Sequence, residues 1–108
     1  LRSCSNEQLE LEMPWRDEIV SNPAIGSAHG GVLASLIDLT GLYTLLSQGT
    51  GAKATADLRV DYHRPATSGP LVASGKIIKI GKNISVAETR VYGPTGNLLA
   101  SGRGAYVC

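Results

Sequence analysis

The sequence predicts an α+β domain in which one long central helix is wrapped by a curved antiparallel β-sheet of five to six strands. The first observation is an apolar run, residues 32–46, that leaves no polar stripe, so a helix there must be covered by other structure on nearly every side. The second is a series of strand-like segments after this run, joined by connections short enough to favour antiparallel neighbours. Together these observations place one helix against one sheet.

Length and composition fit a single domain that spans residues 1–108. Hydrophobic residues make up 43% of the chain and charged residues 18%, which is a globular composition. Phe is absent and aromatic residues amount to only 5%, so we expect an aliphatic core. The net charge of +1 argues against a nucleic-acid partner, because such proteins usually carry a large basic excess.

The two cysteines, Cys4 and Cys108, lie near opposite ends of the chain without metal-ligand spacing. We interpret them as free thiols of a cytoplasmic protein, with a bridge between the two ends as the alternative. No stretch reaches the roughly 18 consecutive apolar residues of a membrane span and none has the features of a signal peptide, so we expect a soluble protein without a membrane partner. The chain starts at Leu1 and not at a methionine, which leaves open whether residues precede it.

The first elements follow from periodicity and from the positions of proline and glycine. Polar and apolar residues alternate over 8–13, which predicts a strand that Pro14 ends. Residues 15–28 contain proline and glycine without a clear period, so we expect a loop with one helical turn near 17–20. The central helix should span about 30–47 and stop at the glycines that follow.

Four strands should follow the helix. Residues 54–63 alternate, so we expect Ala56, Leu58, Val60 and Tyr62 to face the helix and the residues between them to face solvent or a neighbour. The remaining strands are expected at 71–80, 84–92 and 98–107. One helix cannot cover the whole sheet, so we expect a homodimer that covers the remaining faces and edges.

Asp38 is the only acidic or basic side chain in the otherwise largely apolar helix. A carboxylate among leucines is costly unless it is paired, hydrogen-bonded or neutralised. The structural explanation is a hydrogen bond within the chain, for which Ser35 and Thr40 are nearby. The helix start favours a functional explanation, because Gly30 and Gly31 let a substrate approach the backbone and the first turn has unpaired N–H donors suited to an oxyanion.

These glycines belong to a longer pattern. His29-Gly30-Gly31 opens the apolar helix, an acid follows nine residues after the His, Asn22-Pro23 lies upstream, and Asp61-Tyr62-His63-Arg64-Pro65 follows after the next strand. From about Leu9 to Tyr106 the chain resembles the hot-dog thioesterases of the phenylacetyl-CoA thioesterase (PaaI) type. The resemblance implies a thioester hydrolase acting on acyl-CoA, built as a homodimer with shared active sites that often pairs into a tetramer.

Helix geometry and the resemblance together assign the main catalytic roles. The Gly31 N–H can polarise the thioester carbonyl, and Asp38 can act as nucleophile or general base. Seven residues separate them, so they share a helix face but lie roughly 10 Å apart along the axis, too far to serve one carbonyl carbon. The site must therefore use two helices, and the resemblance implies that the other subunit donates the acid.

Other residues of the motif have two readings or a role by resemblance only. His29 either caps the helix or orients the thioester or the leaving sulfur. By resemblance, Asn22 contacts the acyl end or the water. Thr40 either bonds the acid or faces another helix, and Leu42 stands where relatives carry a hydroxyl residue that supports the nucleophile or water.

Coenzyme A carries phosphates, so its part of the site should be basic. By resemblance, Arg64, Lys82 and Asn83 hold the nucleotide, with His63 beside them. The chain has no glycine-rich phosphate loop and no metal-ligand cluster, so we expect neither a bound cofactor nor a metal.

Two other functions are alternatives to thioester hydrolysis. An acyl-thioester dehydratase or hydratase uses the same fold and pairs a His with a helix acid, although the His-Gly-Gly helix start favours hydrolysis. A non-catalytic acyl-CoA-binding module would keep the glycines and the basic residues without needing Asp38. The sequence does not decide between an aryl and an aliphatic acyl group.

Overall fold

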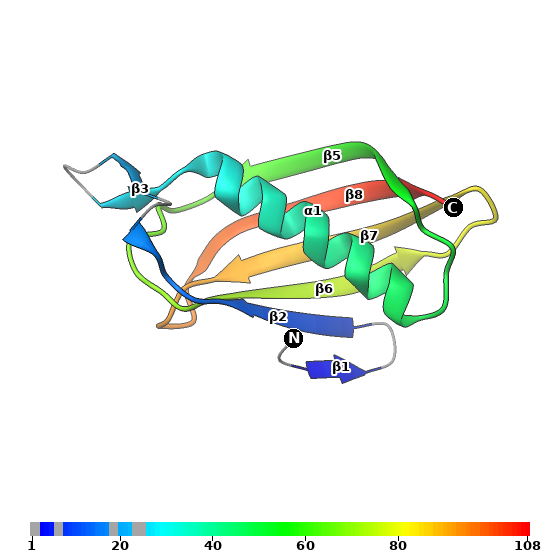
Figure 1. Cartoon of the computed structure of the whole chain (residues 1–108), viewed down its shortest axis with the longest axis horizontal. Helices are drawn as coiled ribbons and strands as arrows, with labels where there is room; N and C mark the ends of the chain where they lie inside the picture. Colours follow the sequence, from blue (N-terminus) through cyan, green and yellow to red (C-terminus); the bar gives the residue numbers. More distant parts are fainter. Residues whose placement is uncertain (1–2, 6–7, 18–19, 23–25) are drawn as a thin grey trace.

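The computed structural model describes residues 3–5, 8–17, 20–22 and 26–108, with side chains described in 8–17 and 26–108. Within these residues one helix packs against one antiparallel sheet (Figure 1). This sheet has the strand order β1-β2-β6-β7-β8-β5. The strand bounds are Ser3–Ser5 for β1, Gln8–Met13 for β2, Ala54–Tyr62 for β5, Leu71–Lys79 for β6, Ile84–Tyr92 for β7 and Leu98–Val107 for β8. The architecture confirms the predicted fold class.

The helix α1 spans Gly30–Ser47, as predicted, and crosses one face of the sheet diagonally (Figure 1). Its buried residues recur every three or four positions and therefore form one stripe toward the sheet. Gln48 caps its C-terminal end, and Gly49 follows with a φ of 79°, a left-handed conformation that glycine adopts without strain. The predicted glycine stop is confirmed.

Two short pairings were not predicted. β1 extends the sheet beyond β2, and β3 (Val20–Asn22) pairs with β4 (Ser27–Ala28) where we expected a loop. Strands of two or three residues are too short for an alternating pattern to be recognised in the sequence. Of the helical turn expected near 17–20, residues 18 and 19 lie outside the described residues.

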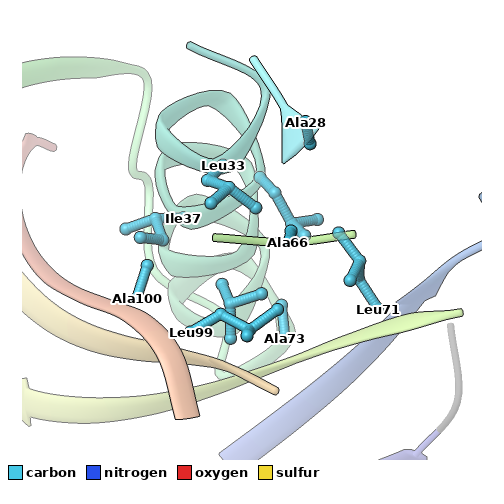
Figure 2. Packing of buried hydrophobic residues seen from close by; sticks show 10 residues of the cluster. Ala28, Leu33, Ile37, Ala66, Leu71, Ala73, Leu99 and Ala100 are labelled. Atoms are coloured by element: carbon cyan, nitrogen blue, oxygen red, sulfur yellow. The ribbon is translucent and has the colours of Figure 1, made fainter. Parts of the chain in front are cut away.

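The core between helix and sheet is mainly aliphatic, as expected. Near the helix start, Leu33 and Ile37 of α1 belong to one cluster with Leu99 and Ala100 of β8 (Figure 2). A second cluster contains Leu45, Ala52, Ile77, Ala87 and Tyr106. Two aromatic residues join these aliphatic side chains: Tyr106 is fully buried, and the partly buried Trp15 packs against the first cluster.

The expectation that the helix is covered on nearly every side is wrong for the single chain. The sheet contacts only one side of α1, and Leu39, Tyr43 and Leu46 are 43%, 45% and 41% exposed. With a mean hydropathy of 1.4, the helix also meets the length and composition of a membrane span. Because its buried stripe packs on the sheet, we interpret it as a core helix whose open side is free for another subunit or a ligand.

Strand β5 lies at one edge of the sheet, where its only partner among the described strands is β8. The register shifts between Thr55 and Asp57, so Ala56 forms a bulge. Leu58 and Val60 pack on the core as predicted, and Tyr62, although exposed, contacts the helix start at Gly30, whereas Ala56 is exposed. The free edge of β5 is therefore open to a partner strand.

Candidate active site

The helix start is capped by its own histidine. Gly31 N–H donates to His29 Nδ1 at 3.1 Å, and Val32 N–H donates to His29 O at 3.0 Å. Because Nδ1 accepts, a neutral ring carries its proton on Nε2, and this donor belongs to an exposed side chain. The capping role of His29 is confirmed, and a role toward substrate is still a prediction.

The Gly31 N–H, which we expected as the donor to the thioester carbonyl, is thus already occupied. The reason is that the N-cap imidazole takes this orphan donor of the first turn. Gly30 N–H has no hydrogen-bond partner among the described residues, so it is a donor that the first turn leaves available. Gly30 O accepts from Tyr62 Oη at 2.8 Å, which ties the helix start to the end of β5.

Asp38 is half-buried and lies on the flank of α1 next to β5. Its Oδ1 accepts from Thr55 Oγ1 at 2.6 Å, a short charge-assisted hydrogen bond. Strict alternation along the strand would turn Thr55 away from the helix, and the bulge at Ala56 changes that direction. The hydroxyl that Leu42 cannot supply therefore comes from β5.

The two hydroxyl residues expected to bond Asp38 do other things. Thr40 Oγ1 is buried and donates to Leu36 O at 2.6 Å, within its own helix. Ser35 is exposed on the outer side of the helix. The sequence-based explanation of how the acid is satisfied is therefore wrong in its partners.

Tyr106 supports Asp38 from the sheet side. Its Oη donates to Asp38 O at 2.9 Å, and its ring is fully buried. Burial, and then the nearby Asp38 carboxylate, raise the pKa of Tyr106 well above its ordinary value, so the phenol stays protonated. A Cβ at Gly41 or Gly104 would collide with this phenol, so these two glycines form the slot that holds it.

A groove of about 530 Å³ runs beside the helix start. Its apolar lining comes from Met13 of β2 and from Val32, Leu36 and Leu39 of α1. The remaining lining residues are His29, Gly31 and Ser35. Asp38 of the same chain is not among the lining residues, because it lies on the flank of the helix next to β5.

The basic residues expected to hold the nucleotide lie at opposite ends of the sheet. Arg64 N–H donates to Leu99 O near the start of β8, whereas Asn83 O accepts from Cys108 N–H beyond its end. The 10 residues of β8 span roughly 30 Å. Arg64 and Lys82 of one chain therefore cannot hold the same phosphate.

His63 lies at the Arg64 end. Its Nε2 is 2.8 Å from Ser101 Oγ, and its side chain is exposed. Arg64, Lys82 and Asn83 are also exposed, so all four are accessible to a ligand without being held around one.

Asn22, the remaining predicted site residue, lies in β3, but its side chain is outside the described residues. The side chain of Cys4 is also outside them. Cys108 is a free thiol whose Sγ lies 3.3 Å from Ser85 Oγ.

A second hollow, of about 290 Å³, lies on the face of the sheet away from the helix. Charged side chains of both signs line it. In the strand register Arg103 of β8 lies opposite Glu88 of β7 on one side and opposite Arg59 of β5 on the other. The sheet separates this hollow from Asp38, so it is not part of the candidate site. In the described part of the chain, no group of three or more His, Cys, Asp and Glu side chains is arranged to hold a metal.

Sequence reasoning missed two residues of the site, Thr55 and Tyr106. No motif marks Thr55, because the bulge at Ala56, between Thr55 and Asp57, has no sequence signal. For Tyr106 a weak signal existed: glycines at 102 and 104 in one strand indicate a close approach on one face.

Fold and site now define the class of protein, a hot-dog domain whose central helix combines a glycine-rich start with a hydrogen-bonded acid. The chain belongs to the thioesterase superfamily, whose family model matches residues 25–100. The similarity to PaaI-type proteins, which the motif indicated, is thereby confirmed at the level of the family.

Individual relatives agree with this assignment. Human acyl-coenzyme A thioesterase 13 is 34% identical over 106 residues, covering 95% of this chain and 74% of that protein. The medium/long-chain acyl-CoA thioesterase YigI of Escherichia coli is 29% identical over 122 residues, covering 99% of this chain and 79% of that protein.

Solved structures resemble the whole chain. A crystallised member of the thioesterase superfamily has a TM-score of 0.94 and 42% identity, covering 99% of this chain and 81% of that one. The Escherichia coli PaaI protein from the phenylacetic acid degradation operon has a TM-score of 0.83 and 27% identity, covering 94% of this chain and 76% of that one.

Proposed function

We propose that this protein is an acyl-CoA thioesterase that hydrolyses the thioester bond between coenzyme A and an acyl group. The observation that carries the proposal is the Asp38 carboxylate, which Thr55 holds on a helix that begins with His29-Gly30-Gly31. Membership of the thioesterase superfamily and the names of the human and Escherichia coli relatives support the same substrate class.

In the proposed reaction Asp38 acts as general base or as nucleophile. As a base it takes a proton from water, whose oxygen adds to the carbonyl carbon; as a nucleophile its own oxygen adds, and water then hydrolyses the anhydride. On either route a helix-start donor, Gly30 N–H or His29 Nε2–H, stabilises the tetrahedral oxyanion, and the CoA thiolate leaves. On both routes the hydrogen bond from Thr55 keeps the Asp38 carboxylate oriented.

The proposed active unit is a homodimer with shared sites. Within one chain the helix start and Asp38 are about 10 Å apart along the axis, so a second chain must supply one of them to any given thioester. The free edge of β5 lies next to both groups and supports pairing there. An antiparallel two-fold pairing of β5 edges would also bring the Arg64 end of one chain to the Lys82 end of the other.

The test is release of free thiol from a panel of acyl-CoAs by the parent protein and by Asp38→Asn. The variant should keep its assembly and its binding of acyl-CoA. Its kcat should fall by a factor of about a hundred or more, the scale expected for loss of a catalytic carboxylate. Turnover at the parent rate would contradict the role of Asp38.

Thr55→Val and Thr55→Ser form a matched pair in the same assay. Valine removes the hydrogen bond to Asp38 and should lower kcat by about tenfold, whereas serine keeps the hydroxyl and should stay close to the parent. A parent protein that binds acyl-CoA but releases no thiol would favour the binding module, and one that adds water to an enoyl-CoA would favour the hydratase.

A further inference from the structure

We infer that the groove of Met13, Val32, Leu36 and Leu39 is the acyl-chain site, and that the preferred substrates carry an unbranched aliphatic chain of medium length. This inference rests on the proposed thioesterase function and adds the acyl group to it. The four residues are called the acyl groove below.

The position of the acyl groove fits a chain that extends from the thioester. One part of its lining is His29 and Gly31, at the helix start where the carbonyl oxygen is proposed to bind. It continues along α1 to Leu39, eight residues beyond Gly31, which corresponds to about 12 Å of helix. The volume of about 530 Å³ lies within the usual range of small-molecule sites, roughly 300 to 1,000 Å³.

The chemistry of the lining distinguishes aliphatic from aryl groups. Among the described residues, the apolar side chains that line the groove are branched aliphatics and one thioether, and no charged side chain and no Phe, Tyr or Trp lines it. A phenyl ring gains most from edge-to-face or stacked aromatic neighbours, which this groove does not offer. Met13 is unbranched and adapts to a flexible chain.

The far end of the groove sets the chain length. Leu39 is the last residue of α1 in the lining, so a chain that passes it leaves the groove and gains no further contact with the lining. The exposed stripe continues to Tyr43 and Leu46, which do not line the groove. The groove differs from the rest of this stripe because one of its ends lies at His29 and Gly31, at the helix start. The groove is therefore continuous with the proposed thioester site, and this favours an acyl chain over a second copy of the protein as its occupant.

The first experiment compares kcat/KM for butyryl-, hexanoyl-, octanoyl-, decanoyl-, dodecanoyl- and hexadecanoyl-CoA with benzoyl- and phenylacetyl-CoA. Up to the groove length, kcat/KM should rise about fourfold for each added methylene, and it should level off between octanoyl- and dodecanoyl-CoA. The two aryl substrates should fall at least tenfold below the best aliphatic one. If kcat/KM does not change with chain length, or is highest for an aryl substrate, the inference is overturned while the thioesterase function stands.

The second experiment compares Leu39→Trp with Leu46→Trp, two equally exposed leucines of the same helix of which only the first lines the groove. Leu39→Trp should lower kcat/KM for dodecanoyl-CoA at least ten times more than kcat/KM for butyryl-CoA, and Leu46→Trp should change neither. Equal effects on both substrates, or a change of assembly state in Leu39→Trp alone by light scattering, would overturn the inference, the latter by assigning the groove to a subunit contact. Absence of thiol release from every acyl-CoA by the parent would instead reject the proposed function.

Discussion

Tyr106 joins the stability of the core to the position of the acid. Its ring fills the slot between Gly41 and Gly104, and its phenol is bonded to the backbone of Asp38. A protonated phenol is required for this bond because the carbonyl oxygen only accepts. The raised pKa of Tyr106 keeps it protonated over the range in which most enzymes work.

The free energy of unfolding should therefore fall more steeply above pH 10 in the parent than in Tyr106→Phe. Below the unfolded pKa of about 10, both states hold the phenol proton and the contribution of Tyr106 is fully present. Above it the unfolded chain loses the proton that the folded protein keeps, so stability decreases as pH rises, by at most about 1.4 kcal/mol per pH unit. Urea unfolding followed by circular dichroism measures both slopes.

The control for this comparison is Tyr43→Phe, which removes a phenol from the exposed side of the helix. Its slope should match that of the parent, so that other groups titrating in the same range cancel. If parent and Tyr106→Phe lose stability in parallel, the buried hydrogen bond to Asp38 does not control this proton.

At the scale of secondary-structure elements, long repeating patterns could be read from the sequence. The helix and the strands β2, β7 and β8 have the predicted bounds, and β5 and β6 end one residue earlier than predicted. Each of these elements carries its own signal, either an apolar run closed by glycines or an alternation closed by a turn. The short strands β1, β3 and β4 carry none, because two or three residues do not establish a period.

The partners of Asp38 could not be read in this way. Thr55 reaches it from 17 residues away through a bulge, and Tyr106 from 68 residues away through the order of strands in the sheet. Local pattern fixes which residues share a face of one element, but neither register shifts nor strand order are local. The sequence therefore predicted that the helix starts at Gly30 and carries Asp38, but it did not predict the contacts of Asp38 with Thr55 and Tyr106.

The start of α1 allows the two roles of His29 to be separated. His29→Ala removes the acceptor for Gly31 N–H and should lower stability by about 1 kcal/mol, a shift of roughly 4 to 8 °C in Tm. His29→Asn keeps a capping oxygen and should unfold near the parent temperature. Because asparagine cannot place a donor where Nε2–H lies, we expect its kcat to fall about tenfold.

Differential scanning calorimetry and thiol release on the same samples measure the two effects. An asparagine variant with parent stability and parent turnover would show that His29 only caps the helix. The alanine variant alone cannot make this distinction, since a frayed helix start would displace the Gly30 donor as well.

At the scale of the whole molecule, the positions of the candidate groups relative to the edge strand β5 decide whether one chain can form a complete site. One chain carries an acid on the β5 flank of its helix, a donor at the helix start, and basic residues at the two far ends of its sheet. None of these groups converge within the chain. A two-fold axis at the β5 edge would make the two chains antiparallel there. It would bring the helix start of one chain toward Asp38 of the other, and the Arg64 end of one sheet toward the Lys82 end of the other.

Mixed dimers test this arrangement. One parent carries Asp38→Ala; the other carries Gly31→Val, at an exposed glycine where a side chain blocks the helix start without disturbing the core. If each site combines the helix start of one chain with the acid of the other, the mixed dimer contains one doubly damaged site and one intact site. It should therefore show about half of the parent activity per dimer, measured by thiol release after purification with two different tags.

The matched control places both substitutions in one chain and pairs it with an unmodified chain. If sites are shared, each site of this dimer takes one damaged group from the double variant, so both sites should be inactive. If each site lies within one chain, the unmodified chain keeps a working site and the result reverses: about half activity here and none in the first mixed dimer. The two dimers contain the same four groups in different chains, so a difference between them reports only on which chain supplies the acid to which helix start.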